Sequence, residues 1–233
     1  MTKIAIMQPT YLPWLGYFDL IHRSDIFVFL DSVQFDKRSW QQRNRIKAPN
    51  GELMLTVPVI TKGRFDQKIY DVEIDTSQKY IKKHLNSIYS FYNKTKYFGD
   101  YIKELEDIYN EDIENISQLN KKLIYWLSSK FGITTHFTSS SKIDARGNKT
   151  ELLVNICKEV GADHYISPAG SKGYIDQNNL FVKSKIKLSY QNYNHPAYNQ
   201  LHGDFIPYMS AIDLLFNEGD CSLAIIRSGS LFN

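Results

Sequence analysis

The sequence predicts an α/β fold built on a Rossmann-like, mostly parallel sheet, and two observations carry this prediction. Short apolar runs that suit strands buried on both faces alternate along the chain with segments of helical spacing. The opening segment, residues 3–31, also reads as a strand, a tight aromatic loop, a helix and a second strand with almost no spare residues. Ligands of such sheets collect in the crevice outside the carboxyl ends of the strands, so we expect the functional site there.

Strands at residues 4–6 and 26–30 open the expected sheet. The loop 8–17 between them contains two prolines, which restrict its backbone and should make it stiff. Gln8 and Asp31 follow the two strands directly and would lie at the same edge of the sheet, where a polar side chain is costly to bury without a partner. We therefore predict that both bind substrate.

The same loop carries three aromatic side chains, Tyr11, Trp14 and Tyr17. Such rings either stack on a ligand or only cover the edge of the sheet. Under the first alternative, Tyr11 and Tyr17 are predicted to bind substrate.

Residues 33–51 form the densest cationic segment of the chain. Arginine and lysine recognise phosphate, and amide side chains position polar groups, so this segment is predicted to hold a phosphate-bearing substrate. Its candidate residues are Gln34, Lys37, Arg38, Asn44 and Lys47.

Strands over residues 52–60 and 69–74 are followed by three segments of helical spacing within residues 77–132. Ser117 is the expected cap of the third helix. No stretch is rich enough in proline, glycine and serine to separate two domains. We expect residues 1–233 to form a single domain with a helical insertion over residues 77–132.

The alternation of strands and helices then returns, with strands expected over residues 134–139, 164–167 and 186–190 and a helix over residues 148–160. A further helix over residues 206–217 would bury Asp213 among apolar side chains. Because a buried carboxylate needs a partner, we expect Lys37 or Arg38 to pair with it.

Two loops in this half are candidate anion sites. Lys149 and Thr150 begin a helix, where free N–H groups favour phosphate, although an ordinary helix cap explains the same residues. Ser167, Gly170 and Lys172 follow a strand in a turn of small residues, which suits either an anion-binding nest or a turn without ligand.

The loop 194–205 holds two of the six histidines. Histidine titrates near neutrality, so His202, or as a second choice His195, is predicted to take a proton from an attacking amine or hydroxyl. Asp204 would orient an imidazole ring and Gln200 would contact the substrate. In the alternative, both histidines bond backbone carbonyls and only shape the loop.

Several classes of protein are disfavoured by composition and motif. A net charge of +3 with interspersed signs does not indicate DNA binding, and no stretch approaches the roughly 20 apolar residues of a membrane span. Without a signal peptide pattern, a cytoplasmic location is expected. Cys157 and Cys221 lack paired spacing and are expected to be reduced core thiols, and no metal site is predicted. The G-x-S-x-G, G-x-G-x-x-G and phosphate-loop signatures are missing.

Three segments carry a family resemblance: QPTYLPWLGY, DSVQFDKRSWQQRNRIKAPNG and NHPAYNQLHGDFIPYMSAIDLLFN. They closely resemble the WbqC-like family of bacterial proteins, and the resemblance covers nearly the whole chain. Members lie mostly among genes for O-antigen and other surface polysaccharides, and a role as a glycine transferase has been proposed for some. The opening strand, loop, helix and strand also resemble the nucleotidyltransferase and pantothenate synthetase group, although Pro13 and Tyr17 stand at its two histidine places.

The resemblance implies two hypotheses. In the first, the protein is a transferase that moves a glycyl or related acyl group onto the amine or hydroxyl of a nucleotide-linked sugar. The acyl donor stays open between a thioester, an aminoacyl-tRNA and ATP with a free amino acid. In the second, the protein binds a nucleotide-linked sugar or a partner of polysaccharide assembly without catalysis. The sequence leaves the oligomeric state open.

Overall fold

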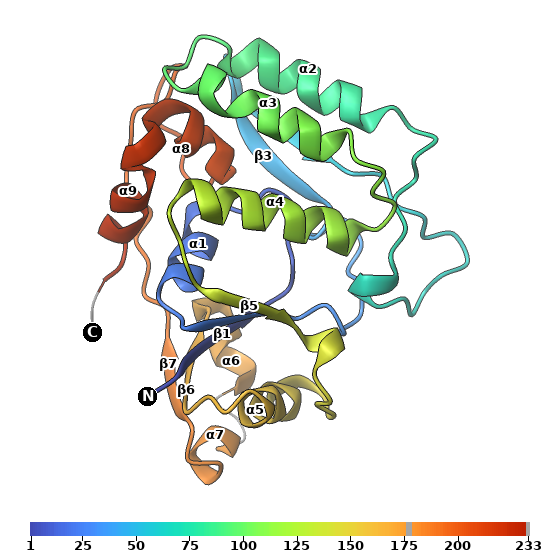
Figure 1. Ribbon diagram of the computed structural model, residues 1–233, viewed down its shortest axis with the longest axis vertical. Helices are drawn as coiled ribbons and strands as arrows, with labels where there is room; N and C mark the ends of the chain where they lie inside the picture. The colour runs from blue at the N-terminus through green and yellow to red at the C-terminus, as the bar shows by residue number, and fades with distance from the viewer. Residues whose placement is uncertain (176–178, 232–233) are drawn as a thin grey trace.

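Five parallel strands form the central sheet of the computed structural model, which describes residues 1–175 and 179–231 (Figure 1). The strands are β1 (Lys3–Met7), β2 (Ile26–Phe29), β5 (His136–Ser139), β6 (His164–Ser167) and β7 (Lys187–Tyr190), in the spatial order β5-β2-β1-β6-β7. The predicted α/β fold with a Rossmann-like sheet is confirmed. Because the chain builds outward from β1 in both directions, the topological switch point lies between β1 and β6.

Strand residues alternate between two apolar cores, one on each face of the sheet. Ile4 and Ile6 belong to one core, whereas Ala5 belongs to the other. The register places Ala5 beside Phe27 of β2 and Ile166 of β6, and all three side chains face the same core. Both faces of the strands are therefore buried, as the apolar runs in the sequence indicated.

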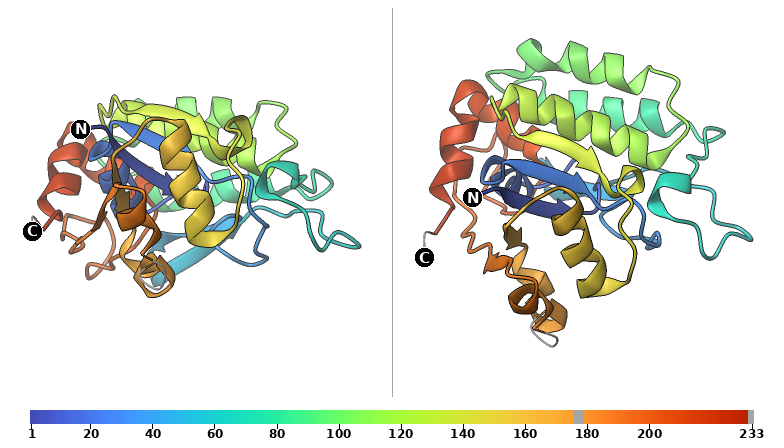
Figure 2. Two further views of the ribbon diagram at one scale, coloured as in Figure 1. Left: turned by 90° about the horizontal axis from the view of Figure 1, so that it is seen from below. Right: turned by 60° about the horizontal axis from the view of Figure 1, so that its bottom comes forward.

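Helices cover each face of the sheet in a separate layer (Figures 1 and 2). One layer consists of α1 (Leu15–His22), α4 (Ile116–Lys130), α8 (Ala211–Glu218) and α9 (Ser222–Ser228). The other consists of α5 (Lys149–Glu159), α6 (Lys172–Ile175) and α7 (Leu180–Lys183). Single 3-10 turns connect some elements: η2 (Ser140–Lys142), η3 (Ala169–Ser171) and η4 (Gly219–Cys221).

A long excursion separates β2 from β5. It begins with an antiparallel hairpin of β3 (Arg43–Ala48) and β4 (Gly51–Thr56), and continues through η1 (Ile69–Asp71), α2 (Tyr80–Tyr92) and α3 (Phe98–Tyr109) to α4. Helices α2 and α3 lie outermost, above the hairpin and α4 (Figure 1). This arrangement holds the hairpin over the carboxyl end of β1.

Three local predictions were wrong. Residues 69–74 do not form a strand, because Ile69 and Tyr70 donate their amides to the carbonyls of Val33 and Asp31 and so curl into a 3-10 turn. The cap of α4 is Asn115 rather than Ser117, since the Asn115 side chain accepts from the first amides of the helix. Cys221 is exposed, whereas Cys157 is buried as expected.

In the described ranges, no helix combines the length and the apolar character that crossing a membrane requires.

Candidate functional site

Two adjoining cavities open at the carboxyl end of β1, beside the switch point with β6. The first, called the hairpin cavity, measures about 260 Å³ and is lined by Met7, Thr10, Pro13, Trp14, Tyr17, Trp40, Asn44, Arg45 and Tyr208. The second, called the β6 cavity, measures about 220 Å³ and is lined by Met7, Trp14, Gly16, Tyr17, Leu20, Pro168, Ala169, Gly170, Gln191 and Tyr193. Because the two cavities share three of these side chains, we treat them as one crevice. Its position is where open α/β sheets bind ligands.

Trp14 forms the wall between the two cavities. It immediately precedes α1, and its indole lies over Gly16, where even one added methyl group would overlap the ring. Tyr193 meets the indole edge-on at 5.6 Å between ring centroids, and Tyr208 lies against it at 5.3 Å. A glycine at position 16 is therefore what allows the tryptophan to fold back into the crevice.

Hydrogen bonds bring three segments together at this point: the opening loop, the hairpin, and the loop of residues 191–210 between β7 and α8, called the C-terminal loop. The amide of Ser210 donates to the carbonyl of Arg45, and the amide of Ala211 donates to the carbonyl of Pro13, each over 2.8 Å. The side-chain amide of Asn44 donates to the carbonyl of Leu12 at 2.6 Å. The hairpin cavity is thus enclosed by segments far apart in the sequence.

Among residues 1–175 and 179–231, Arg45 is the only charged side chain that lines the crevice. Its guanidinium pairs with Glu52 at 2.9 Å and lies 5.6 Å from the centre of the Trp40 ring. Trp40 is 49% exposed, which is unusual for so large a ring. The crevice therefore offers aromatic faces and one cation, and this combination suits an anionic ligand with a flat or ring-shaped group.

His195 lies behind the dividing wall, and its two ring nitrogens differ. Nδ1 is 2.9 Å from the carbonyl of Pro196 and must donate, because a carbonyl only accepts. Nε2 therefore carries the lone pair, and this buried atom has no partner in the described part of the chain. Burial lowers the pKa of His195, so the ring is neutral at pH 7.

His202 and Asp204 lie away from the crevice. Nε2 of His202 donates to the carbonyl of Phe91, at the end of α2, over 2.9 Å. The Asp204 side chain is exposed, and its backbone carbonyl accepts from the ammonium of Lys47. Within the described residues, none of the three lines either cavity, but the His195 ring lies directly behind the crevice, against Trp14 and Tyr208.

Lys47, Gln200 and Asp213 form a buried polar network beneath the C-terminal loop. Lys47 donates to Gln200 at 3.0 Å, and Gln200 donates to Asp213 at 2.9 Å. The hydroxyls of Tyr92 and Tyr198 donate to the carboxylate of Asp213 over 2.8 and 2.7 Å. Burial raises the pKa of Asp213. The expected pairing of Asp213 with Lys37 or Arg38 was wrong, because those two side chains are exposed at the surface.

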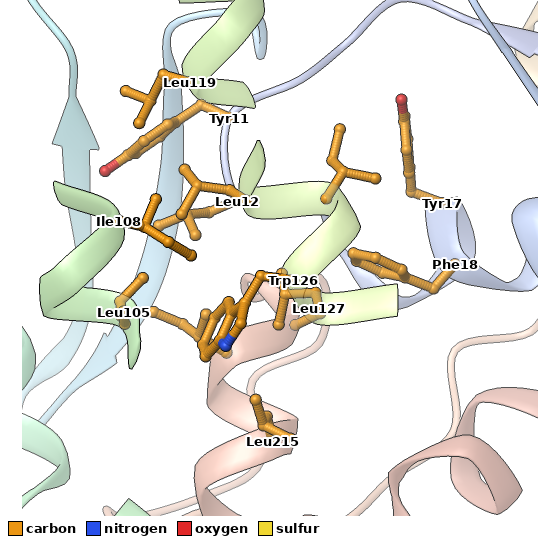
Figure 3. Close-up of a cluster of buried hydrophobic side chains, with 14 of the residues drawn as sticks. Tyr11, Leu12, Tyr17, Phe18, Leu105, Ile108, Leu119, Trp126, Leu127 and Leu215 are labelled. Atoms are coloured by element: carbon orange, nitrogen blue, oxygen red, sulfur yellow. The ribbon is translucent and has the colours of Figure 1, made fainter. Parts of the chain in front are cut away.

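Tyr11 and Tyr17 point in different directions. Tyr11 is fully buried, with its ring among Leu12, Ile108 and Leu119 (Figure 3). Its hydroxyl lies 2.8 Å from Nδ1 of His84. Tyr17 lines both cavities with its ring.

Gln8 supports the crevice from its position after β1. Its backbone carbonyl accepts from the Tyr17 hydroxyl at 3.0 Å, and its side-chain oxygen accepts from Gln41 at 2.9 Å. Gln8 therefore holds the floor of the crevice without lining either cavity.

The remaining predicted site residues are spread over the molecule. Gly170 lines the β6 cavity, and Ser167 is buried beneath it with a hydroxyl bonded to Ser171. The Lys172 ammonium lies 5.7 Å from the centre of the Tyr190 ring. The side chain of Gln34 donates to the carbonyl of Phe65, and Asp31, at the end of β2, pairs with Lys121. At the start of α5, Lys149 is exposed and Thr150 is buried.

Sequence reasoning missed Trp40, Tyr193 and Tyr208. Each is an aromatic residue in loop-like sequence, and their number among 16 tyrosines and three tryptophans gave no signal of which face the crevice. The described ranges contain no group of three or more histidine, cysteine, aspartate or glutamate side chains placed to hold a metal ion.

Comparison with known proteins gave one family and one relative that bear on the chain. Residues 8–225 match the model of the WbqC-like protein family. The uncharacterized protein Rv1507c of Mycobacterium tuberculosis (strain ATCC 25618 / H37Rv) is 38% identical over 221 residues, which cover 94% of this chain and 95% of that protein. No solved structure matches the chain.

Proposed function

The chain belongs to the WbqC-like protein family, and we propose that it is a transferase of surface-polysaccharide biosynthesis that moves a glycyl or related acyl group onto a nucleotide-linked sugar held in the crevice. The observation that carries the proposal is the pair of aromatic cavities at the switch point, divided by Trp14 and backed by His195, whose Nε2 has no partner in the described part of the chain. The link to surface polysaccharides rests on the family resemblance.

The dimensions and lining of the crevice support a two-part ligand. Each cavity is smaller than the roughly 300–1,000 Å³ of a pocket that holds a whole drug-sized ligand. We place the nucleotide in the hairpin cavity, where Trp40 and Tyr208 offer ring faces and Arg45 is near enough to pair with phosphate. The acceptor end of the sugar then lies at Trp14, next to the β6 cavity.

In the proposed reaction, the sugar amine or hydroxyl attacks the acyl carbon. The new bond to nitrogen or oxygen forms as the bond from the acyl carbon to its leaving group breaks. His195 accepts the proton of the attacking group at Nε2 and returns it to the leaving group, while Pro196 holds the ring through Nδ1. A thioester, an aminoacyl-tRNA or an adenylate formed from ATP and a free amino acid would each supply the activated acyl group.

A second candidate function is binding without catalysis, and one observation favours it. Apart from Arg45, the residues of the described chain that line the crevice carry aromatic, apolar, hydroxyl or amide side chains or are glycine. Such a lining would be sufficient for a protein that carries or presents a nucleotide-linked sugar.

The two functions are separated by offering acyl donors together with a panel of nucleotide-linked amino sugars. Mass spectrometry of the sugar should show a mass increase that needs both substrates and the protein. Trp40→Ala should weaken sugar binding, whereas Phe65→Ala, a matched loss of an exposed ring outside the crevice, should not. Saturable binding with no modified sugar for any donor class would favour the binding protein.

A further inference from the structure

A second hollow on the same sheet edge, called the lysine-lined cavity, lies where β2 and β5 end and α4 begins. Its volume is about 560 Å³. Figure 1 shows the start of α4 beside η1 and beside the turn that follows β5. Since β2 stands between β5 and β1, and neighbouring strands are about 4.8 Å apart, the cavity lies about 10 Å along the edge from the crevice. None of the described residues lines both this cavity and the crevice.

Positive charge is in excess in this cavity: the described residues that line it include Lys121, Lys122 and Lys142 but only one carboxylate, that of Asp31. Both carboxylate oxygens of Asp31 are already engaged. Lys121 pairs with the carboxylate at 2.5 Å, and the amide and the hydroxyl of Ser141 each donate to it over 2.9 Å. Asp31 thus fixes the Lys121 ammonium at the wall.

The other two lysines are more exposed. The Lys122 ammonium pairs with Glu111, which lies outside the lining. The exposed Lys142 has no ion pair within residues 1–175 and 179–231. Lys142 is therefore available to an anion that enters the cavity.

The first turn of α4 adds a second, independent feature. The amino end of this 15-residue helix, which is the positive end of its dipole, lines the cavity through Asn115, Ser117 and Gln118. Ser117 in that turn lines the cavity and is only 1% exposed, yet its hydroxyl has no hydrogen-bond partner in the described chain. A buried hydroxyl is rarely left without a partner, so this one points to a ligand that completes it.

We propose that the lysine-lined cavity binds a phosphate-bearing small molecule, with its phosphate held by Lys121, Lys142 and the hydroxyl of Ser117. Helix amino ends and lysine ammonium groups both favour phosphate oxygens, and the Ser117 hydroxyl supplies a donor. The exposed rings of Tyr70 and Tyr125 line the same cavity, and their faces suit contact with the part of the ligand that is not phosphate. The proposal does not depend on what the crevice binds.

Inorganic pyrophosphate is the probe that tests this site. In a titration at constant ionic strength, the backbone amides of residues 117–122 and 140–142 should shift saturably in nitrogen-proton NMR spectra. Lys142→Gln should weaken the apparent affinity about two- to fivefold, the size expected for one exposed ion pair. Lys158→Gln, which removes an exposed lysine on the opposite face of the sheet, should leave it unchanged.

Ser117→Ala gives the sharper readout. It removes no hydrogen bond of the protein, so the melting temperature should not fall, whereas pyrophosphate affinity should drop about tenfold, as for a hydrogen bond to a charged group. Shifts spread over lysines throughout the surface, or equal affinities for Lys142→Gln and Lys158→Gln, would overturn the site. A melting temperature that falls with unchanged affinity in Ser117→Ala would overturn the role of Ser117.

Discussion

The imidazole of His195 stacks on the indole of Trp14, with ring centroids 6.0 Å apart and planes inclined by 16°. The residue that divides the crevice is thereby in contact with a ring whose Nε2 has no partner in the described residues. A ligand that moves the Trp14 ring would also change the surroundings of His195, so in the proposed reaction sugar binding and proton transfer would share this pair of side chains.

The two histidines of the C-terminal loop should respond differently to substitution. His195→Asn keeps a donor for the Pro196 carbonyl but lacks Nε2, so turnover should fall about 10²–10⁴-fold with substrate affinity changed less than about threefold. His202→Asn loses the bond to Phe91, so it should lower the free energy of unfolding by about 1 kcal/mol and leave the turnover of the folded protein unchanged. Steady-state kinetics and urea unfolding measure both, and the reverse pattern would make His202 the base.

Gly16→Ala should disable the crevice although alanine favours helices. The added methyl group would overlap the Trp14 ring and push it out of place, so affinity for a nucleotide-linked sugar should fall at least about tenfold. The control is Gly99→Ala in α3, where nothing lies within 4 Å of the new methyl group. That variant should bind normally and be up to about 1 kcal/mol more stable. Equal affinities of the two variants would contradict the placement of Trp14.

Asp31→Asn should be strongly destabilising, because it leaves the Lys121 ammonium without its charge partner at a site where Asp31 is 1% and Lys121 18% exposed. The expected loss is about 2–4 kcal/mol, reduced from the value for a fully buried pair by the partial exposure of Lys121. Asp107→Asn, which breaks an exposed pair with Lys103, should cost less than about 0.5 kcal/mol. Urea unfolding at pH 7 compares the two variants. Similar losses in the free energy of unfolding would mean that the Asp31–Lys121 pair contributes no more to stability than an exposed ion pair.

His84 should make the protein sensitive to acid. Burial lowers its pKa to about 4, below the unfolded value near 6.5. The unfolded chain therefore binds the proton first, so the contribution of neutral His84 is complete above pH 6.5 and is lost as the pH falls toward 4. Between pH 7 and pH 5 this one group should remove about 2 kcal/mol from the free energy of unfolding.

The His84→Gln variant isolates this effect, because the other titrating groups are common to both proteins. Asp213, whose pKa is raised in the folded state, makes the protein more stable as the pH falls, and it does so in both the parent protein and the variant. The difference in the free energy of unfolding between pH 7 and pH 5 should be smaller in the variant by that amount. An identical pH dependence would show that His84 is not the acid-sensitive group.

The sheet could be predicted from the sequence because its signal is local. The runs at residues 4–6, 26–30 and 164–167 are apolar on both faces, and short loops tie each to a helix, which leaves few topologies open. Residues 69–74 have a similar apolar content, but their backbone forms a turn because Ile69 and Tyr70 donate to the carbonyls of Val33 and Asp31. Hydrogen-bond partners so far away in the sequence cannot be predicted from a local pattern.

The site was only partly predictable, for a related reason. Gln8 and Gly170 lie at strand ends and fall at or near the crevice, as the rule for carboxyl edges indicates. Asn44 lines the hairpin cavity as predicted, although its side-chain amide also holds the opening loop. Lys47 has the polar character of a ligand-binding residue, but its contact with Gln200 engages it in the fold. Conversely, Tyr208 faces the crevice only because its neighbours Ser210 and Ala211 bond to distant segments.

The most direct test of the account is a fluorescence titration of the variant Trp40→Phe/Trp126→Phe, which retains Trp14 as its only tryptophan. A nucleotide-linked amino sugar that enters the crevice should change the Trp14 emission saturably, and the same titration of Trp40→Phe/Trp126→Phe/Gly16→Ala should show little change at equal concentrations. If equilibrium dialysis detects binding of the sugar nucleotide while the Trp14 emission stays constant, the ligand lies elsewhere and the crevice is not the site.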